Sequence, residues 1–81
     1  MTFVTVQVSK PANRLIFING DYSASAGNSN DSFTVPTGGQ IFETLTSARC
    51  VDFRKSFRVR PADADSGVTV ELDRVDPPEP I

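Results

Sequence analysis

The 81-residue chain has the length of one small domain, a net charge of −2, one cysteine and no histidine. A single cysteine excludes an intramolecular disulfide, and Cys50 alone leaves too few ligands for a Cys/His zinc site. The weak net charge predicts no attraction to nucleic acid, and no apolar run approaches the ~20 residues needed for membrane insertion. Domains this small often need added support, and here self-assembly or docking on a larger protein is what the composition leaves open.

The N-terminal part of the chain predicts two strands followed by a polar segment. Residues 2–8 alternate between apolar and polar side chains, as in a half-buried strand. Residues 15–18 form a continuous apolar run, which is typical of a strand covered on both faces or placed centrally in a sheet. Residues 19–32 are rich in Asn, Gly, Asp and Ser, and Tyr22 is their one large side chain. We expect a polar surface loop at 19–32 that is either a binding loop or simply flexible.

A second pair of strands is expected between residues 33 and 46. Residues 32–35 are expected to form a short strand that Pro36 ends, and residues 36–39 have the composition of a tight turn. The run at 40–46 then completes a predicted hairpin.

Residues 50–75 show the clearest alternation in the chain. Apolar side chains at 51, 53, 57 and 59, and again at 68, 70 and 72, predict two strands that each have one apolar face. Antiparallel pairing as a hairpin would bring arginines of the first strand toward Glu71 and Asp73 of the second. Lys55 interrupts the apolar register, which predicts a bulge, a strand that leaves the core, or a guarded edge.

These segments predict one all-β domain over residues 1–75. The expected fold is a small antiparallel β-sandwich or open barrel of six to seven strands with no substantial helix, because no segment has helical apolar spacing. Residues 76–81 contain three prolines and are expected to form an extended tail outside the sheet.

Five of the eight basic residues lie between positions 49 and 60. They serve either as partners of the acidic C-terminal part across the predicted hairpin or as an anion-binding patch. The candidate protein-binding residues are the following: Tyr22, Arg54, Lys55, Arg58 and Arg60.

The sequence disfavours catalysis. Without histidine there is no ordinary base for a nucleophile, so Cys50 is expected to be a small packed side chain. Asp63 and Asp65 have the spacing that opens a calcium loop, but Asp, Ser and Gly are also turn formers, and a turn is favoured. No enzymatic activity, metal or cofactor is expected.

Three motifs resemble the PEGA family of small β-domains over residues 14–74. Residues 16–20 are similar to its strand ending in Asp-Gly, residues 33–39 stand at its Pro-Glu-Gly-Ala turn, and the runs at 57–60 and 68–72 match its closing strands. Thr37 replaces the glutamate of the turn, and no Gly-Tyr pair precedes the last two strands. The resemblance implies a sandwich-like, non-catalytic domain, in a family that is mostly extracytoplasmic.

The function predicted is that of a non-enzymatic structural or accessory protein that docks on other subunits of a larger assembly, for example a phage decoration or minor virion protein. The partners would be other protein subunits, including further copies of this chain. The alternatives are a small protein-binding inhibitor and a PEGA-like carbohydrate- or surface-binding module. The N-terminus lacks the pattern of a secretory signal, which predicts cytoplasmic synthesis or incorporation into a virion or other assembly.

Overall fold

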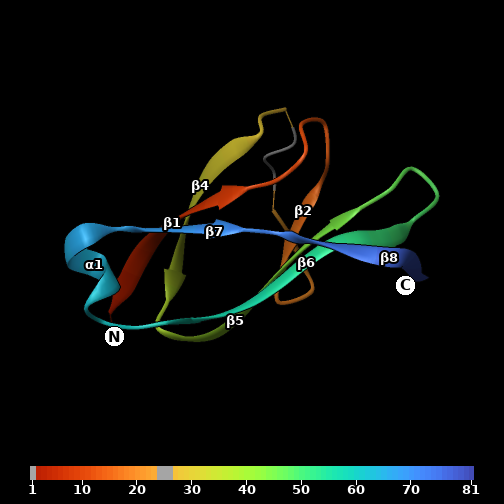
Figure 1. Cartoon of the computed structure of the whole chain (residues 1–81). Coiled ribbons are helices and arrows are strands. Elements are labelled where there is room, and N and C mark those ends of the chain that lie inside the picture. Colours follow the sequence, from red (N-terminus) through yellow and green to blue (C-terminus); the bar gives the residue numbers. More distant parts are fainter. Residues whose placement is uncertain (1, 24–26) are drawn as a thin grey trace.

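The computed structural model describes residues 2–23 and 27–81, which form two facing β-sheets (Figure 1). The strands are β1 (Phe3–Ser9), β2 (Ile16–Ile18), β3 (Asp21–Ser23), β4 (Asn30–Pro36), β5 (Gly38–Leu45), β6 (Cys50–Val59), β7 (Val68–Glu71) and β8 (Asp73–Pro80), and the short helix α1 (Asp63–Ser66) joins β6 to β7. One sheet has the order β4-β1-β7 and the other the order β3-β2-β5-β6-β8. The sheets do not close into a barrel, so the predicted small all-β sandwich is confirmed, with eight strands in the described residues.

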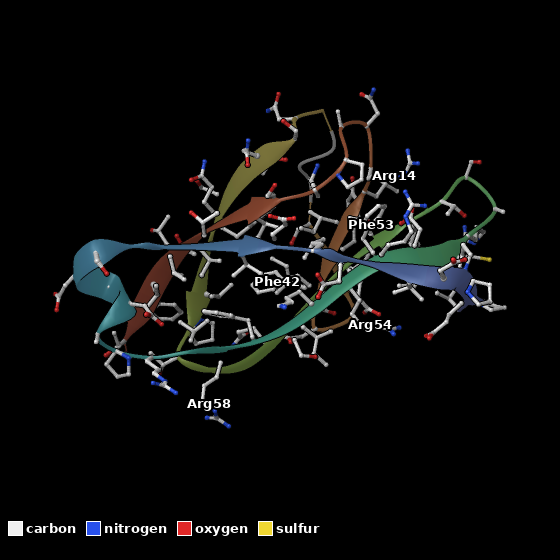
Figure 2. All side chains as sticks on the ribbon, in the orientation of Figure 1. Arg14, Phe42, Phe53, Arg54 and Arg58 are labelled. Carbon is white, nitrogen blue, oxygen red and sulfur yellow. The ribbon has the colours of Figure 1, made fainter. Side chains whose placement is uncertain are left out.

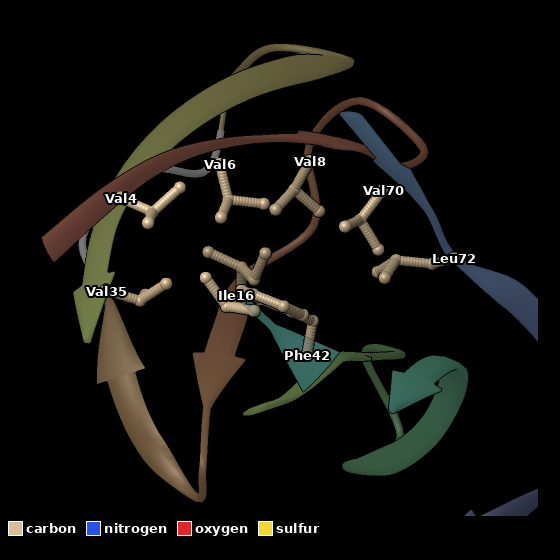
Figure 3. Close-up of a cluster of buried hydrophobic side chains, with 9 residues drawn as sticks. Val4, Val6, Val8, Ile16, Val35, Phe42, Val70 and Leu72 are labelled. Atoms are coloured by element: carbon tan, nitrogen blue, oxygen red, sulfur yellow. The ribbon is translucent and has the colours of Figure 1, made fainter. Parts of the chain in front are cut away.

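The core lies between the two sheets and contains side chains from both (Figure 3). Strand β1 supplies one wall, because its apolar side chains alternate inward as the sequence predicts. Phe42 of β5 and Ile16 of β2 are fully buried on the opposite side. The buried cluster consists of Val4, Val6, Val8, Ile16, Val35, Phe42, Val59, Val70 and Leu72.

Strands β2 and β3 form a tight hairpin at the start of the segment predicted to be a loop. Asn19 and Gly20 both have positive φ, 53° and 83°, as a two-residue type I′ connection requires. The Asn19 side chain donates a 2.6 Å hydrogen bond to Oε1 of buried Gln40 and accepts the backbone N–H of Ile41 at 2.8 Å. Tyr22 therefore lies on a short edge strand rather than in a loop, and residues 24–26 of the predicted loop lie outside the described residues.

The hairpin predicted at residues 33–46 is wrong, because its two strands belong to different sheets. Strand β4 pairs antiparallel with β1, whereas β5 pairs with β2 and β6. The chain crosses between the sheets at Thr37, next to Gly38 with a φ of 117°. Two alternating runs separated by a Pro/Gly turn are compatible with a hairpin and equally with two strands in different sheets. The local pattern therefore could not distinguish the two arrangements.

The hairpin predicted at residues 50–75 is also wrong, although both of its strands exist. Strand β7 pairs in parallel with β1, and β6 pairs antiparallel with β5 and β8. The apolar faces of β6 and β7 do meet, since Val59 and Val70 share the core, but they meet across the sandwich rather than side by side. Helix α1 replaces the predicted turn and carries the chain to the other sheet.

The proline-rich segment predicted to be a tail is strand β8 at the edge of the five-stranded sheet (Figure 1). It pairs with β6 at two places, Phe53 and Arg54 with Arg74 and Asp73, and Cys50 and Val51 with Pro80 and Glu79. The ladder is irregular between these two places. Prolines are tolerated on an edge strand because their missing N–H can face away from the neighbouring strand.

Candidate functional site

The surface of the five-stranded sheet that points away from the core carries a row of side chains across four neighbouring strands. Tyr22 of β3 lies opposite Phe17 of β2, Phe17 lies opposite Glu43 of β5, and Glu43 lies opposite Arg54 of β6. Directly opposed residues project from the same side of a sheet, so these four share one surface. We call this surface the outer face, and Figure 2 shows Arg54 and Arg58 projecting from it, away from Phe42.

Apolar side chains occupy much of the outer face. The Phe17 and Tyr22 rings are tilted against each other with centroids 5.7 Å apart, and Tyr22 is 57% exposed. Ile41, on the same side of β5, is 42% exposed. A depression of about 220 Å³ lies beside them, and its lining residues are Phe17, Gly20, Glu43, Leu45, Val51 and Ile81.

Arg54 is held in the middle of the outer face by two carboxylates. Its Nε donates to Glu43 and its Nη2 to Glu79, each at 2.9 Å. The hydrogen bond to Arg54 lowers the pKa of Glu79 below its ordinary value, and the bonds to Glu79 and Glu43 raise the pKa of Arg54. The guanidinium is therefore positioned by its own sheet, with Glu43 on one neighbouring strand and Glu79 on the other.

The other predicted basic residues are dispersed. Arg58 is exposed on the outer face, whereas Lys55 lies opposite buried Phe42 and reaches Asp73 at 3.1 Å. Arg60 is exposed just beyond β6, and its backbone N–H donates to Asp63 at 2.8 Å. The structure thus brings Tyr22, Arg54 and Arg58 onto one surface and places Lys55 and Arg60 elsewhere.

The predicted approach of the basic residues of β6 to the acidic C-terminal part is found with β8 rather than across a hairpin with β7, because Asp73 lies opposite Arg54. Arg54 binds Glu43 and Glu79, and Asp73 binds Lys55. Because β6 and β7 lie in different sheets, Glu71 does not face the arginines of β6.

A larger groove lies at one end of the molecule, between the β1–β2 connection and the β5–β6 turn. Its volume is about 460 Å³, and its lining residues are Asn13, Arg14, Leu15, Phe17, Leu45, Thr46, Ser47 and Arg49. Phe17 and Leu45 also line the depression on the outer face, so the two hollows adjoin. Sequence reasoning missed this groove because residues 13–15 and 45–49 meet only in the folded chain.

Asp52 anchors one wall of the groove. It occupies a bulge in β6, since Thr44 pairs with Phe53 and the next residue, Leu45, pairs with Val51. Its buried carboxylate accepts the Thr44 hydroxyl at 2.6 Å and Nε of Arg14 at 3.0 Å. The irregularity that Lys55 suggested is thus found three residues earlier, where it turns an acidic side chain inward.

The described residues contain no group of three or more His, Cys, Asp or Glu side chains placed to hold a metal ion. Asp63 and Asp65 lie in the first turn of α1, and the half-buried Cys50 thiol contacts the carbonyl of Ala48 at 3.8 Å. Across residues 2–23 and 27–81, no helix is long and apolar enough to cross a membrane.

No protein-family model, curated protein or solved structure matches this chain. The resemblance to the PEGA family therefore stays a prediction from three short motifs.

Proposed function

We propose that this protein is a non-enzymatic docking subunit that binds another protein of a larger assembly through the outer face of its five-stranded sheet. The observation that carries the proposal is the concentration of exposed apolar side chains there. Tyr22, Ile41 and Ile81 are 57%, 42% and 70% exposed. Contiguous exposed apolar surface rimmed by polar groups is typical of protein-binding sites.

The opposite surface of the molecule provides the contrast. The outward side chains of the three-stranded sheet are mostly polar and exposed, such as Thr5 and Gln7 of β1, Ser32 of β4 and Thr69 of β7, and the large apolar one among them is Phe3 at the start of β1. Small hydroxyl and amide side chains are the usual covering of a sheet surface that faces water. The two surfaces of one sandwich therefore differ in chemistry, and the outer face is the one suited to a partner.

Arg54 and Arg58 supply the polar part of this surface. Arginine and aromatic residues are enriched where binding energy concentrates in protein interfaces. Since Glu43 and Glu79 already hold Arg54, less side-chain freedom is lost when a partner covers it. A structural component of a virus particle is one example of the assemblies in which such a subunit would serve.

The test compares two double variants in their binding to large assemblies of the organism from which the chain derives. Tyr22→Ser with Ile41→Ser removes apolar surface from the outer face, and Thr5→Ser with Gln7→Ser changes the polar surface. Co-sedimentation with the assemblies and light scattering of the purified protein measure the outcome. We expect loss of association for the first variant and wild-type association for the second. A stable monomer that binds no assembly, or equal loss in both variants, would overturn the proposal.

A further inference from the structure

The groove at the end of the outer face has the electrostatics of a carboxylate-binding site. Its charged lining side chains are two arginines, Arg14 from the β1–β2 connection and Arg49 from the β5–β6 turn. The other lining side chains are polar or apolar and uncharged. Two arginines that line one hollow favour an anion there, because like charges repel, and planar guanidinium groups match carboxylate geometry.

Arg14 is prepositioned for this role. Buried Asp52 accepts its Nε at 3.0 Å, and Thr44 fixes Asp52 from the core side at 2.6 Å. The Arg14 side chain is still 38% exposed, and within the described residues this bond to Asp52 is the one hydrogen bond from its guanidinium. Its remaining N–H donors are therefore available to a ligand.

The local charge favours a monoanion. Arg14 and Arg49 contribute two positive charges and Asp52 one negative charge, so one carboxylate balances the set. A dianionic phosphate would leave the set with one excess negative charge. A single Asp or Glu side chain is thus better matched than a phosphate group.

The apolar lining identifies what accompanies the carboxylate. Leu15 is 43% exposed at the groove, and Phe17 and Leu45 line both the groove and the adjoining depression of the outer face. We propose that the groove binds an Asp or Glu side chain of the docking partner, with a neighbouring aliphatic side chain of the same segment on Leu15, Phe17 and Leu45. This inference rests on the proposed docking function and names the chemistry of the segment that the partner contributes.

The test uses two blocked tripeptides as probes, acetyl-Leu-Glu-Leu-amide and its Gln counterpart, with the ¹⁵N-labelled protein. Amide signals of Leu45, Ser47 and Arg49 and the Nε–H signals of Arg14 and Arg49 report binding to the groove. We expect saturable shifts with the Glu peptide at millimolar concentration, an affinity at least about tenfold higher than for the Gln peptide, and weakening by added salt. Equal shifts with both peptides, or none, would overturn the proposal.

Variants test the two arginines separately. Arg49→Gln removes an exposed arginine of the groove and is expected to lower the affinity for the Glu peptide about tenfold. Arg60 is a matched exposed arginine outside the groove, and Arg60→Gln should leave that affinity unchanged. Arg14→Lys keeps a positive charge beside Asp52, so the variant is expected to fold. It lacks the planar guanidinium that can bind a carboxylate through two hydrogen bonds, so weaker binding of the Glu peptide is expected. Equal effects of Arg49→Gln and Arg60→Gln would contradict a localised site.

The two proposals fail separately. Assembly binding that depends on Tyr22 and Ile41 without peptide discrimination would reject the groove proposal alone. Discrimination between the Glu and Gln peptides without any assembly binding would reject the docking function and leave a carboxylate site.

Discussion

Asp52 is the residue on which the polar organisation at one end of the molecule depends. Its carboxylate joins three segments, because it accepts from Thr44 of β5 and Arg14 of the β1–β2 connection while lying in β6. Thr44 is fully buried, so its hydroxyl has no route to water if Asp52 is removed. A buried polar group left without a partner costs more than the hydrogen bond contributes when formed.

We therefore expect Asp52→Ala to lower the free energy of unfolding by about 2 kcal/mol. Urea denaturation followed by circular dichroism measures the change. The matched control is Asp65→Ala, an exposed acidic residue of α1 whose removal should change stability by less than about 0.5 kcal/mol. Equal stability of the two variants would show that the Thr44–Asp52–Arg14 bonds contribute nothing net.

The Arg54–Glu79 bond makes a second prediction at the residue scale. The pKa of Glu79 in the folded protein lies below the ordinary value of 4.5, chiefly because Arg54 hydrogen-bonds to its carboxylate. A depressed folded pKa means that the stabilising contribution is present above the unfolded pKa and is lost as pH falls through the lower folded value. Arg54→Gln should move the pKa of Glu79 back up toward 4.5.

NMR titration of the Glu79 side-chain carboxyl carbon measures this shift. Lys55→Gln serves as the control, because Lys55 pairs with Asp73 and not with Glu79. An unchanged Glu79 pKa in Arg54→Gln would contradict the pairing.

At the scale of elements, the β2–β3 hairpin positions both Tyr22 and a buried amide. Asn19 and Gly20 form its turn, and the Asn19 side chain completes the hydrogen bonding of Gln40 and of the Ile41 backbone. This one turn thus links the candidate docking surface to the interior of β5.

Gly20→Ala places a Cβ on a residue with a φ of 83°, and we expect it to lower the free energy of unfolding by about 1 kcal/mol. Gly39→Ala is the matched control, since Gly39 lies in β5 without a positive φ and has no neighbouring atom that a Cβ would meet. Thermal denaturation of both variants provides the comparison. A Gly20→Ala protein as stable as Gly39→Ala would mean that the turn relaxes to another geometry.

For the whole molecule, stability depends on a small core that both sheets share. Phe42 is the largest of its fully buried side chains and comes from a central strand of the five-stranded sheet. A domain of this size buries only ~60–65% of the surface its unfolded chain exposes, so one large cavity removes much of its stability margin.

Phe42→Ala is expected to lower the free energy of unfolding by about 3–5 kcal/mol and to leave much of the protein unfolded near 37 °C. Phe3→Ala, at a site 55% exposed, should cost less than about 1 kcal/mol. Circular dichroism melts distinguish the two outcomes, and similar melting temperatures would contradict the core as described.

The sequence predicted where strands lie more successfully than it predicted which strands pair. Alternation in residues 2–8 and 50–59 predicts which side chains point inward, and the structure agrees at Val4, Val6 and Val59. Val51 was predicted on the same face as Val59, but the bulge at Asp52 places it opposite Leu45 instead. Pairing depends on contacts between distant segments, so two hairpins were predicted where the chain crosses between sheets. The C-terminal segment was predicted to be a tail because of its prolines, whereas it forms the edge strand β8.

The candidate site was predictable only in part. Tyr22, Arg54 and Arg58 were identified from residue type and do share the outer face. Their apolar neighbours were not identified, although the continuous run at 15–18 did predict a strand that is covered on both faces or placed centrally in a sheet. The groove between Arg14 and Arg49 had no local signal, because its two walls are 35 positions apart in the sequence.

The sequence by itself determined the fold class and the absence of an intramolecular disulfide, because composition and period-two alternation are local properties of the chain. Only the tertiary structure decided the strand order, the location of the bulge at Asp52 and the gathering of apolar and basic side chains on one face. The physical reason is that inward and outward directions follow from the backbone of each strand alone. Neighbouring strands, by contrast, are selected by how the whole chain buries its apolar surface.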